Sequence, residues 1–125
     1  MNEQKPIIIS LGGSLIVPNE IDSAFLKEFV ALLTSYVEQG FRFIIITGGG
    51  RLSRTYTLSA KEITTPSNID LDWIGIASTR LNAELVRVLF GDHAHEEIIF
   101  NPEHIPATDK PIILGGGWKP GNSSD

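Results

Sequence analysis

Residues 43–50 read Phe43-Ile44-Ile45-Ile46-Thr47-Gly48-Gly49-Gly50, a β-branched run that ends directly in a glycine cluster. The same join occurs twice more, in Ile7-Ile8-Ile9-Ser10-Leu11-Gly12-Gly13-Ser14 and in Ile112-Ile113-Leu114-Gly115-Gly116-Gly117. β-branched runs favour strands, and glycines let the backbone turn sharply with no side chain in the way of a ligand. Because the carboxyl ends of parallel strands meet at one edge of a sheet, the three joins predict a site for a phosphorylated ligand there.

The composition is that of a single globular domain. The 125 residues are 42% apolar, and the net charge is −5 with no basic run, which argues against a nucleic-acid partner. The chain has no cysteine, so disulfides, zinc–thiolate sites and thiol catalysis are excluded. The start of the chain is polar, and no apolar stretch approaches the roughly 18–20 residues of a membrane span. We therefore expect no signal peptide, no membrane partner and a cytoplasmic location.

Apolar periodicity and turn residues predict the elements of the fold. The expected helices cover about 25–37, 51–62 and 69–90, and the expected strands cover 7–11, 41–47, 97–100 and 111–114. Asp22 or Ser23 is the predicted cap of the first helix and Gly40 its stop, whereas Asp70 is the predicted cap of the long helix and Gly91 its end. The first strand is expected to be buried. This order of elements predicts an α/β fold with a mainly parallel sheet.

The long helix carries two stripes of side chains. Its expected core face is apolar and consists of Ile74, Leu81, Leu85 and Val88. A second stripe of small or short polar residues consists of Asp72, Gly75, Thr79 and Asn82. Such a stripe is usually the solvated side of a helix. This one has neither Lys nor Glu, and short residues also suit a surface that a ligand approaches closely.

The glycine clusters match neither of two well-known phosphate loops. Ser53 and Pro120 stand where a dinucleotide fingerprint requires its third glycine, and the chain has no Gly-Lys pair for a Walker-type loop. The first cluster is compatible with an ordinary tight turn as well as with a phosphate site. Beside the second cluster, Arg51 and Arg54 favour an anion site, because Arg54 lies one turn into the expected helix.

The end of the chain carries further candidate groups. Trp118 can stack on a base, Lys119 can neutralise charge, and Asp125 can organise cationic groups or a metal-bound nucleotide, although a plain surface turn is the alternative. The three histidines lack firm ligand spacing, so we interpret them as exposed loop residues and predict no metal site in His93, His95 or His104.

Four motifs together resemble those of the amino acid kinase superfamily, most closely the archaeal-type UMP kinases. They stand in the right order and span nearly the whole chain: Ser10-Leu11-Gly12-Gly13-Ser14, residues 48–56 (GGGRLSRTY), residues 72–83 (DWIGIASTRLNA) and residues 116–125 (GGWKPGNSSD). The resemblance implies a three-layer α/β/α sandwich of the carbamate kinase-like type. It also implies a phosphotransferase of pyrimidine nucleotide biosynthesis that uses ATP and Mg²⁺ to convert UMP to UDP.

The resemblance implies a role for each matching residue. The UMP-binding positions correspond to Gly49, Asp72, Thr79, Trp118, Lys119, Pro120, Gly121, Asn122, Ser123 and Ser124. The positions around the ATP phosphates correspond to Gly12, Gly13, Ser14, Gly50 and Arg54. Asp125 and Arg54 are the implied catalytic residues, and Asp72 would bind the ribose hydroxyls.

Members of the superfamily continue beyond the position of Asp125 with a half that holds the adenine site. We therefore expect residues 1–125 to be the acceptor half, with the ATP-binding half on the rest of a longer protein or on a second polypeptide. By itself this chain is expected to bind UMP weakly or not at all and to have no kinase activity. The resemblance implies a hexameric homo-oligomer. Alternatives are a related kinase with another acceptor, a nucleotide- or anion-binding module, and a fragment without function.

Overall fold

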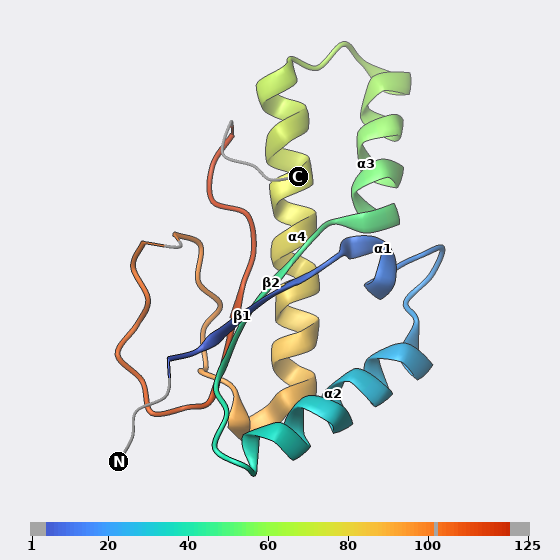
Figure 1. Cartoon of the computed structure of the whole chain (residues 1–125). Helices are drawn as coiled ribbons and strands as arrows, with labels where there is room; N and C mark the ends of the chain where they lie inside the picture. The colour runs from blue at the N-terminus through green and yellow to red at the C-terminus, as the bar shows by residue number, and fades with distance from the viewer. Residues whose placement is uncertain (1–4, 102, 121–125) are drawn as a thin grey trace.

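A parallel three-stranded sheet forms the centre of the chain. The structure is a computed structural model and describes residues 5–101 and 103–120. The strands β1 (Ile7–Leu11), β2 (Phe43–Thr47) and β3 (Ile112–Gly115) lie in the order β1-β2-β3. Leu11 pairs with Thr47 and Ile46 with Gly115, so all three strands end at the same level. The predicted parallel sheet is confirmed, and the three glycine clusters follow strand ends at one edge of it (Figure 1).

The helices lie close to their predicted positions. Their bounds are α1 (Gly13–Ile16), α2 (Ser23–Val37), α3 (Gly50–Ile63), α4 (Asn68–Phe90) and the 3-10 turn η1 (Gly91–His93). The Asp22 carboxylate caps α2 by accepting from the Phe25 N–H at 3.0 Å. Gly91 ends α4 with a φ of +61°, as expected for a glycine stop. The four-residue α1 is too short to show a helical period and was missed.

The cap of α4 differs from the prediction. The Ser67 hydroxyl accepts from the Asp70 N–H at 3.0 Å, so Ser67 is the N-cap and Asp70 lies in the first turn. Both residue types are good caps, and only the backbone geometry selects between them. In the first turn, the carboxylate of Asp70 still interacts favourably with the positive end of the helix dipole.

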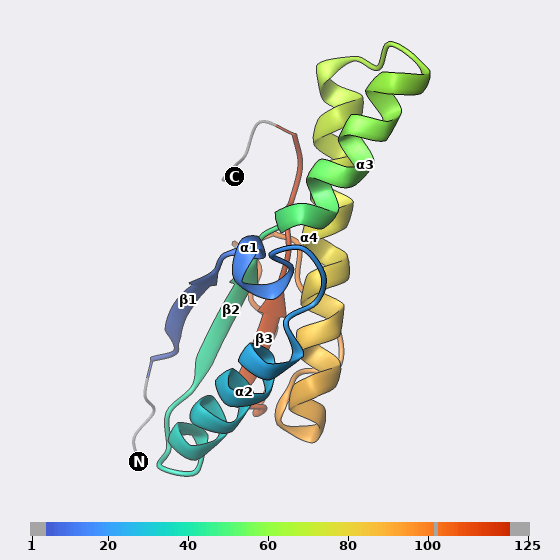
Figure 2. The same ribbon diagram turned by 90° about the vertical axis from the view of Figure 1, so that its right-hand side faces the viewer.

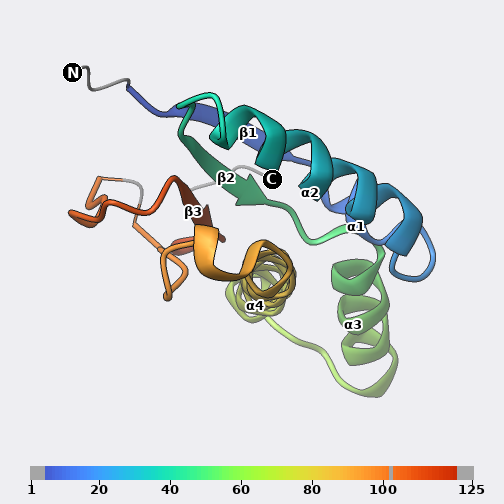
Figure 3. The same ribbon diagram turned by 90° about the horizontal axis from the view of Figure 1, so that it is seen from below.

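The helices α2 and α4 lie on the same side of the sheet (Figure 3). Alternate residues of the sheet point toward them and form one buried cluster with both helices, which includes Leu26, Phe43, Ile45, Val86 and Leu114. The helix α3 packs on α4 instead of the sheet, and α3 with the first half of α4 projects past the carboxyl ends of the strands (Figure 2). The described residues thus show an α/β arrangement with helices on one face of the sheet.

The strand β1 is only partly buried, contrary to the prediction: Leu11 lies in the core, but the start of the strand is exposed. Ile7 is 44% exposed and Ile8 is 71% exposed, because β1 is an edge strand and no described helix covers the face that carries Ile8. A continuous apolar run resembles a central strand in sequence, and the run alone does not distinguish an edge from a centre.

The predicted core face of α4 is wrong for Leu81 and Val88, whereas Leu85 packs against the core as predicted. Leu81 is 59% exposed and Val88 is 61% exposed, whereas Ser78, Asn82, Ala83, Val86 and Phe90 are buried. At the level of the glycine turns α4 lies against backbone, where Asn82 donates to the Gly48 and Gly49 carbonyls, so a small or hydrogen-bonding side chain fits there. Farther along α4, Val86 and Phe90 pack in the apolar core instead of Val88.

The predicted strand at 97–100 does not form. The segment that follows η1 runs beside β3 but makes only two isolated parallel bridges, Ala94 with Ile112 and Ile99 with Gly115. The two bridges are five residues apart in this segment (94 to 99) but only three residues apart in β3 (112 to 115), so a continuous ladder of hydrogen bonds cannot form. The segment bulges away between the bridges.

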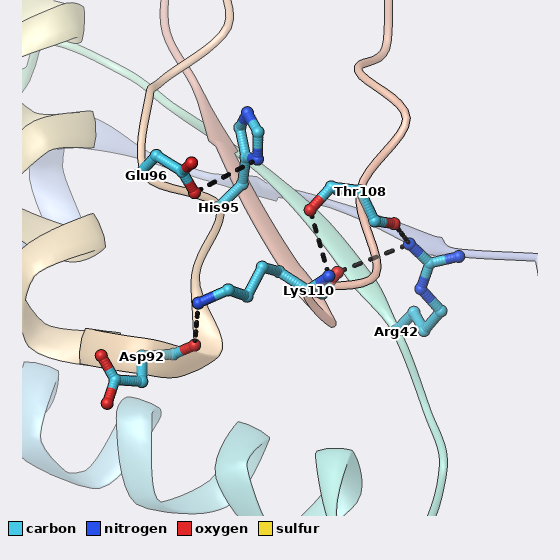
Figure 4. Close-up of polar contacts among 6 residues, drawn as sticks. All are labelled: Arg42, Asp92, His95, Glu96, Thr108 and Lys110. Atoms are coloured by element: carbon cyan, nitrogen blue, oxygen red, sulfur yellow. Dashed lines mark hydrogen bonds and ion pairs between the residues drawn. The ribbon is translucent and has the colours of Figure 1, made fainter.

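The polypeptide between η1 and β3 is tied down at the amino ends of the strands (Figure 4). The Arg42 guanidinium donates to the carbonyl oxygens of Thr108 at 3.1 Å and Lys110 at 3.4 Å, and the Lys110 ammonium donates to the Asp92 carbonyl at 2.8 Å. These contacts lie at the end of the sheet opposite the glycine turns. They hold this segment against the amino ends of the strands.

Within the described ranges, no helix is long and apolar enough to cross a membrane.

We expect the centre of the sheet to dominate the stability of the fold. Ile45 is fully buried in β2, so Ile45→Ala should lower the free energy of unfolding by about 2–5 kcal/mol through lost burial and the cavity left behind. Ile8→Ala on the exposed face of β1 is the matched control and should change it by about 0.5 kcal/mol or less. Urea denaturation measures both, and equal losses would contradict the described packing.

Candidate functional site

The first and second glycine turns touch through their backbones. We use the names first, second and third glycine turn for residues 12–14, 48–50 and 115–117. A Cβ added to Gly13 would lie 2.1 Å from the Gly50 nitrogen, and one added to Gly48 would lie 2.8 Å from the Gly13 nitrogen. Gly50 has a φ of +62°, which side-chain-bearing residues rarely adopt. Close backbone contact therefore requires glycine at Gly13 and Gly48, and the positive φ favours glycine at Gly50 as well. The first and second turns can pack together only because these positions carry no side chain.

The helix α3 starts directly from the second glycine turn. Its N-cap is Gly49, and no described side chain caps that end by a hydrogen bond. Arg51 donates its backbone N–H to the Val17 carbonyl at 3.2 Å, and its guanidinium donates to the Asn19 side-chain oxygen at 2.8 Å. Arg54, one turn into α3, is exposed. The sequence predicted both arginines as candidates for an anion site. The Arg51 guanidinium is already hydrogen-bonded to the loop residue Asn19, so Arg54 is the remaining candidate.

The polar stripe of α4 faces α3 and the glycine turns from Gly75 to Asn82, whereas Asp72 at its start is exposed. The Asn82 side-chain nitrogen donates to the carbonyls of Gly48 at 2.9 Å and Gly49 at 3.3 Å. A Cβ added to Gly75 would lie 3.4 Å from the Ser53 hydroxyl oxygen, which reflects the close approach of α3 and α4 at that level. The interpretation of the stripe as a solvated side is therefore wrong for Gly75 and Asn82 but holds for Asp72.

Thr79 joins α4 to the third glycine turn. Its hydroxyl oxygen accepts from the Gly117 N–H at 2.6 Å and donates to the Ile76 carbonyl at 2.6 Å. The Thr47 hydroxyl of β2 donates to the Thr79 carbonyl at 2.8 Å, so β2, α4 and the third turn are locked together. The hydroxyl proton of Thr79 is thus already used within the fold, and Thr79 holds the turn in place.

Arg80 is a residue of this region that the sequence analysis missed. Its guanidinium donates to the carbonyls of Gly117 and Trp118, each at 3.0 Å, and stacks over the Phe100 ring at 4.0 Å from the ring centre. A Cβ on Gly116 would lie 2.9 Å from the Arg80 Cα. The one feature of the sequence that could have indicated Arg80 is its place next to Thr79, within the motif at residues 72–83.

Asp72 is exposed on α4, one turn before Ile76. The Ile76 side chain is the nearest neighbour that a Cβ on Gly117 would meet, at 3.2 Å. Since residues four apart lie on the same helix face, the Asp72 carboxylate stands beside the course of the segment that leaves the third turn. The structure therefore brings Asp72 and the start of the 117–120 segment to one side of α4.

A cavity of about 570 Å³ lies beside that segment. It is lined by α4, by the segment around residues 95–106, and by Trp118 and Lys119. The Lys119 ammonium lies 4.4 Å from the centre of the Trp118 ring, so one face of this indole is covered by its neighbour. A base that stacks on Trp118 would have to use the other face or displace Lys119.

The remaining predicted site residues divide into two groups. Gly12 and Ser14 are exposed at the first turn, and Pro120 is half-buried at the end of the described segment. Five lie outside the described residues, namely Gly121, Asn122, Ser123, Ser124 and Asp125.

The histidines are placed differently from one another. The His95 side chain is 17% exposed, and its Nδ1 atom is buried with no hydrogen-bond partner, 3.8 Å from the Glu96 carboxylate. The prediction that all three histidines are exposed loop residues is therefore wrong for His95, whose backbone N–H donates to the Ile112 carbonyl of β3, and for His93, which is half-buried in η1. Within residues 5–101 and 103–120, no group of three His, Asp or Glu side chains is arranged to hold a metal ion.

Known proteins share both the sequence pattern and the fold. The model of the amino acid kinase family matches residues 5–112. The uridylate kinase of Thermococcus sibiricus is 33% identical over 121 residues, which cover 95% of this chain and 53% of that protein. The uridylate kinase of Methanosarcina mazei is 36% identical, over 95% of this chain and 51% of that protein.

The solved structure of uridylate kinase from Archaeoglobus fulgidus superposes with a TM-score of 0.78 at 32% identity, over 96% of this chain and 54% of that one. The chain thus spans about half the length of the relatives it matches. The family model covers most of the described sheet and its helices, from the first strand to the start of the third. With its parallel sheet, joined glycine turns and long helix, the chain belongs to the amino acid kinase family.

Proposed function

We propose that the protein is a UMP kinase that transfers the γ-phosphoryl group of ATP to UMP, and that this chain forms the acceptor half. One observation carries the proposal: two side-chain-free turns meet in backbone contact beside an exposed arginine and a helix whose polar stripe holds them. Backbone N–H groups at a helix start are a common way to bind phosphate. The relatives that cover the chain are uridylate kinases, which supports UMP as the acceptor.

The proposed roles follow the geometry of the turns. Gly49 and Asp72 hold UMP, with Asp72 accepting from the ribose hydroxyls and the segment 118–124 enclosing the base. Gly12, Gly13, Ser14, Gly50 and Arg54 surround the phosphates of ATP and the transferring group. Asp125 organises the catalytic centre. Thr79, which the resemblance assigns to UMP, acts by fixing the third turn.

The chemistry needs position and charge more than it needs a reactive side chain. A phosphate oxygen of UMP attacks the γ-phosphorus of ATP, and the bond from that phosphorus to the bridging oxygen breaks, so that its electron pair leaves with ADP. Donors fixed in advance toward the equatorial oxygens stabilise the charge of the transition state without reorganising. In this chain those donors are the N–H groups of the glycine turns and the Arg54 guanidinium.

Mg²⁺ accompanies ATP as part of the nucleotide substrate in this proposal. The described residues do not fit a site of their own for the ion, because no three acidic or histidine side chains gather among them. Mg²⁺ commonly takes one or two carboxylates and otherwise phosphates and water. We therefore assign no described residue as a metal ligand. We also propose a cytoplasmic location and a homo-oligomeric assembly, for which the resemblance is the support.

A panel of acceptors tests the proposal. The chain is assayed alone and fused to the C-terminal half of the Archaeoglobus fulgidus uridylate kinase, with ATP and with UMP, CMP, AMP, carbamate or an isoprenoid phosphate. We expect UDP from the fusion with UMP and no turnover from the chain alone. Transfer to carbamate or to the isoprenoid phosphate, with no transfer to UMP, would identify a different kinase of the family. UDP formation by the chain alone would contradict the expectation that turnover requires the ATP-binding half.

A further inference from the structure

Asn82 occupies an unusual place for a polar residue. It lies on α4 and is 3% exposed, and its side-chain nitrogen donates to two successive carbonyl oxygens of the second turn, those of Gly48 and Gly49. Both partners are acceptors only, so the NH₂ end of the amide is the end that fits there. A buried amide shared between two neighbouring peptide groups restrains both of them at once.

A restraint on a carbonyl oxygen also fixes the direction of the N–H group in the same peptide unit. Because a trans peptide is planar, fixing the Gly48 carbonyl fixes the Gly49 N–H on the opposite side, and fixing the Gly49 carbonyl fixes the Gly50 N–H in the same way. We propose that Asn82 is a positioning residue, which aims the N–H groups of Gly49 and Gly50 away from α4 and into the phosphate site. This inference rests on the proposed function, in which Gly49 serves UMP and Gly50 serves ATP.

The second turn needs such a restraint. Glycines are the least restricted residues of a chain, and the N-terminus of α3 has no side-chain cap among the described residues. The next N–H, that of Arg51, is already bound to Val17. Backbone contact from Gly13 supports the turn on one side, and Asn82 supports it from the helix side. The Gly49 carbonyl also accepts from the Ser53 N–H of α3 at 3.4 Å, and Asn82 is the side chain that restrains it together with the Gly48 carbonyl.

Ser78 provides a matched control. It is also buried on α4, at 5% exposure, but its hydroxyl donates at 3.0 Å to the Ile74 carbonyl of its own helix. Asn82→Ala and Ser78→Ala each remove one buried polar group from the same helix, yet only the first releases the second turn.

The first readout needs no ligand. Amide ¹⁵N relaxation on the chain should show lower order parameters for Gly49 and Gly50 in Asn82→Ala, and values unchanged from the original sequence in Ser78→Ala. Unchanged order in Asn82→Ala would overturn the inference, whatever the protein binds. Failure of the fusion to phosphorylate UMP would instead overturn the proposed function, and the relaxation readout would still test the inference.

The second readout is affinity in the fusion described above. Asn82→Ala should raise the KM for UMP and for ATP at least tenfold, whereas Ser78→Ala should change either less than twofold. If Asn82→Ala fails to fold, Asn82→Asp keeps the shape and tests the donor, because only its protonated form can donate to a carbonyl. The KM of Asn82→Asp for UMP and ATP, divided by that of the original sequence, should fall as the pH falls. A KM ratio that does not vary with pH would contradict a donor role for Asn82.

Discussion

Gly13→Ala is expected to lower the free energy of unfolding by about 3 kcal/mol or more, the upper part of the range for overpacked sites. The new methyl carbon would lie 2.1 Å from the Gly50 nitrogen and 2.6 Å from the Gly49 carbonyl carbon. Neither neighbour is a side chain that can rotate away, so the two turns must separate. Because the turns carry the proposed phosphate donors, phosphate or UMP binding should be lost together with stability.

Gly12→Ala is the control for this prediction. Gly12 has nothing within 4 Å of its added Cβ, and its φ of −59° and ψ of 139° suit any residue. Alanine there should stabilise the chain by about 0.4–1 kcal/mol, because it restricts the unfolded state more than the folded one. Urea denaturation measures the free energy of unfolding of both variants. A similar loss of stability in Gly12→Ala and Gly13→Ala would contradict the close contact between the first and second turns.

Arg54→Ala is expected to reduce kcat for UMP phosphorylation by roughly 10²–10³-fold, the size found when one fixed donor to a developing oxyanion is removed. Arg54 is exposed one turn into α3, where its fork can reach a phosphate held at the start of the helix. Arg54→Lys should recover only part of the rate, since lysine keeps the charge but loses the bidentate geometry.

Arg51→Ala separates this role from a general effect of positive charge. Arg51 lies on the same helix turn, but its guanidinium donates to Asn19 at 2.8 Å on the surface. We expect its removal to change kcat less than threefold by the loss of a screened surface charge, a small effect of the kind typical for exposed pairs. Steady-state kinetics of the fusion with the three variants would contradict the proposal if Arg51→Ala and Arg54→Ala were equally impaired.

The sequence predicted the elements whose signals are local. Strand β2 and helices α2, α3 and α4 follow from β-branched runs, apolar spacing and stop residues, and their ends differ from the prediction by at most two residues. The convergence of the glycine turns also followed, because parallel strands that start in register must end together. The four-motif resemblance identified the family, which the match to residues 5–112 confirms.

The errors share a physical origin in contacts between distant segments. Leu81 was predicted as core because hydropathy does not reveal that the surface facing this part of α4 is bare backbone, against which the neighbouring Asn82 fits and leucine does not. The register mismatch that prevents a strand near Ile99 depends on where Ala94 meets Ile112, and no local pattern encodes it. Arg80 was missed because its carbonyl partners lie 37 and 38 residues away in sequence.

The central claim, that this chain carries a UMP acceptor site at its glycine turns, is tested most directly by an NMR titration of the chain with UMP and with AMP. We expect weak, saturable shifts of the Gly49 and Gly50 amides and of residues near Asp72 with UMP, stronger in the fusion than in the chain alone. AMP should cause smaller shifts, and Asp72→Ala should abolish the UMP response. UMP shifts that match those of AMP and persist in Asp72→Ala, or glycine turns that do not respond to UMP even in the folded fusion, would contradict the claim.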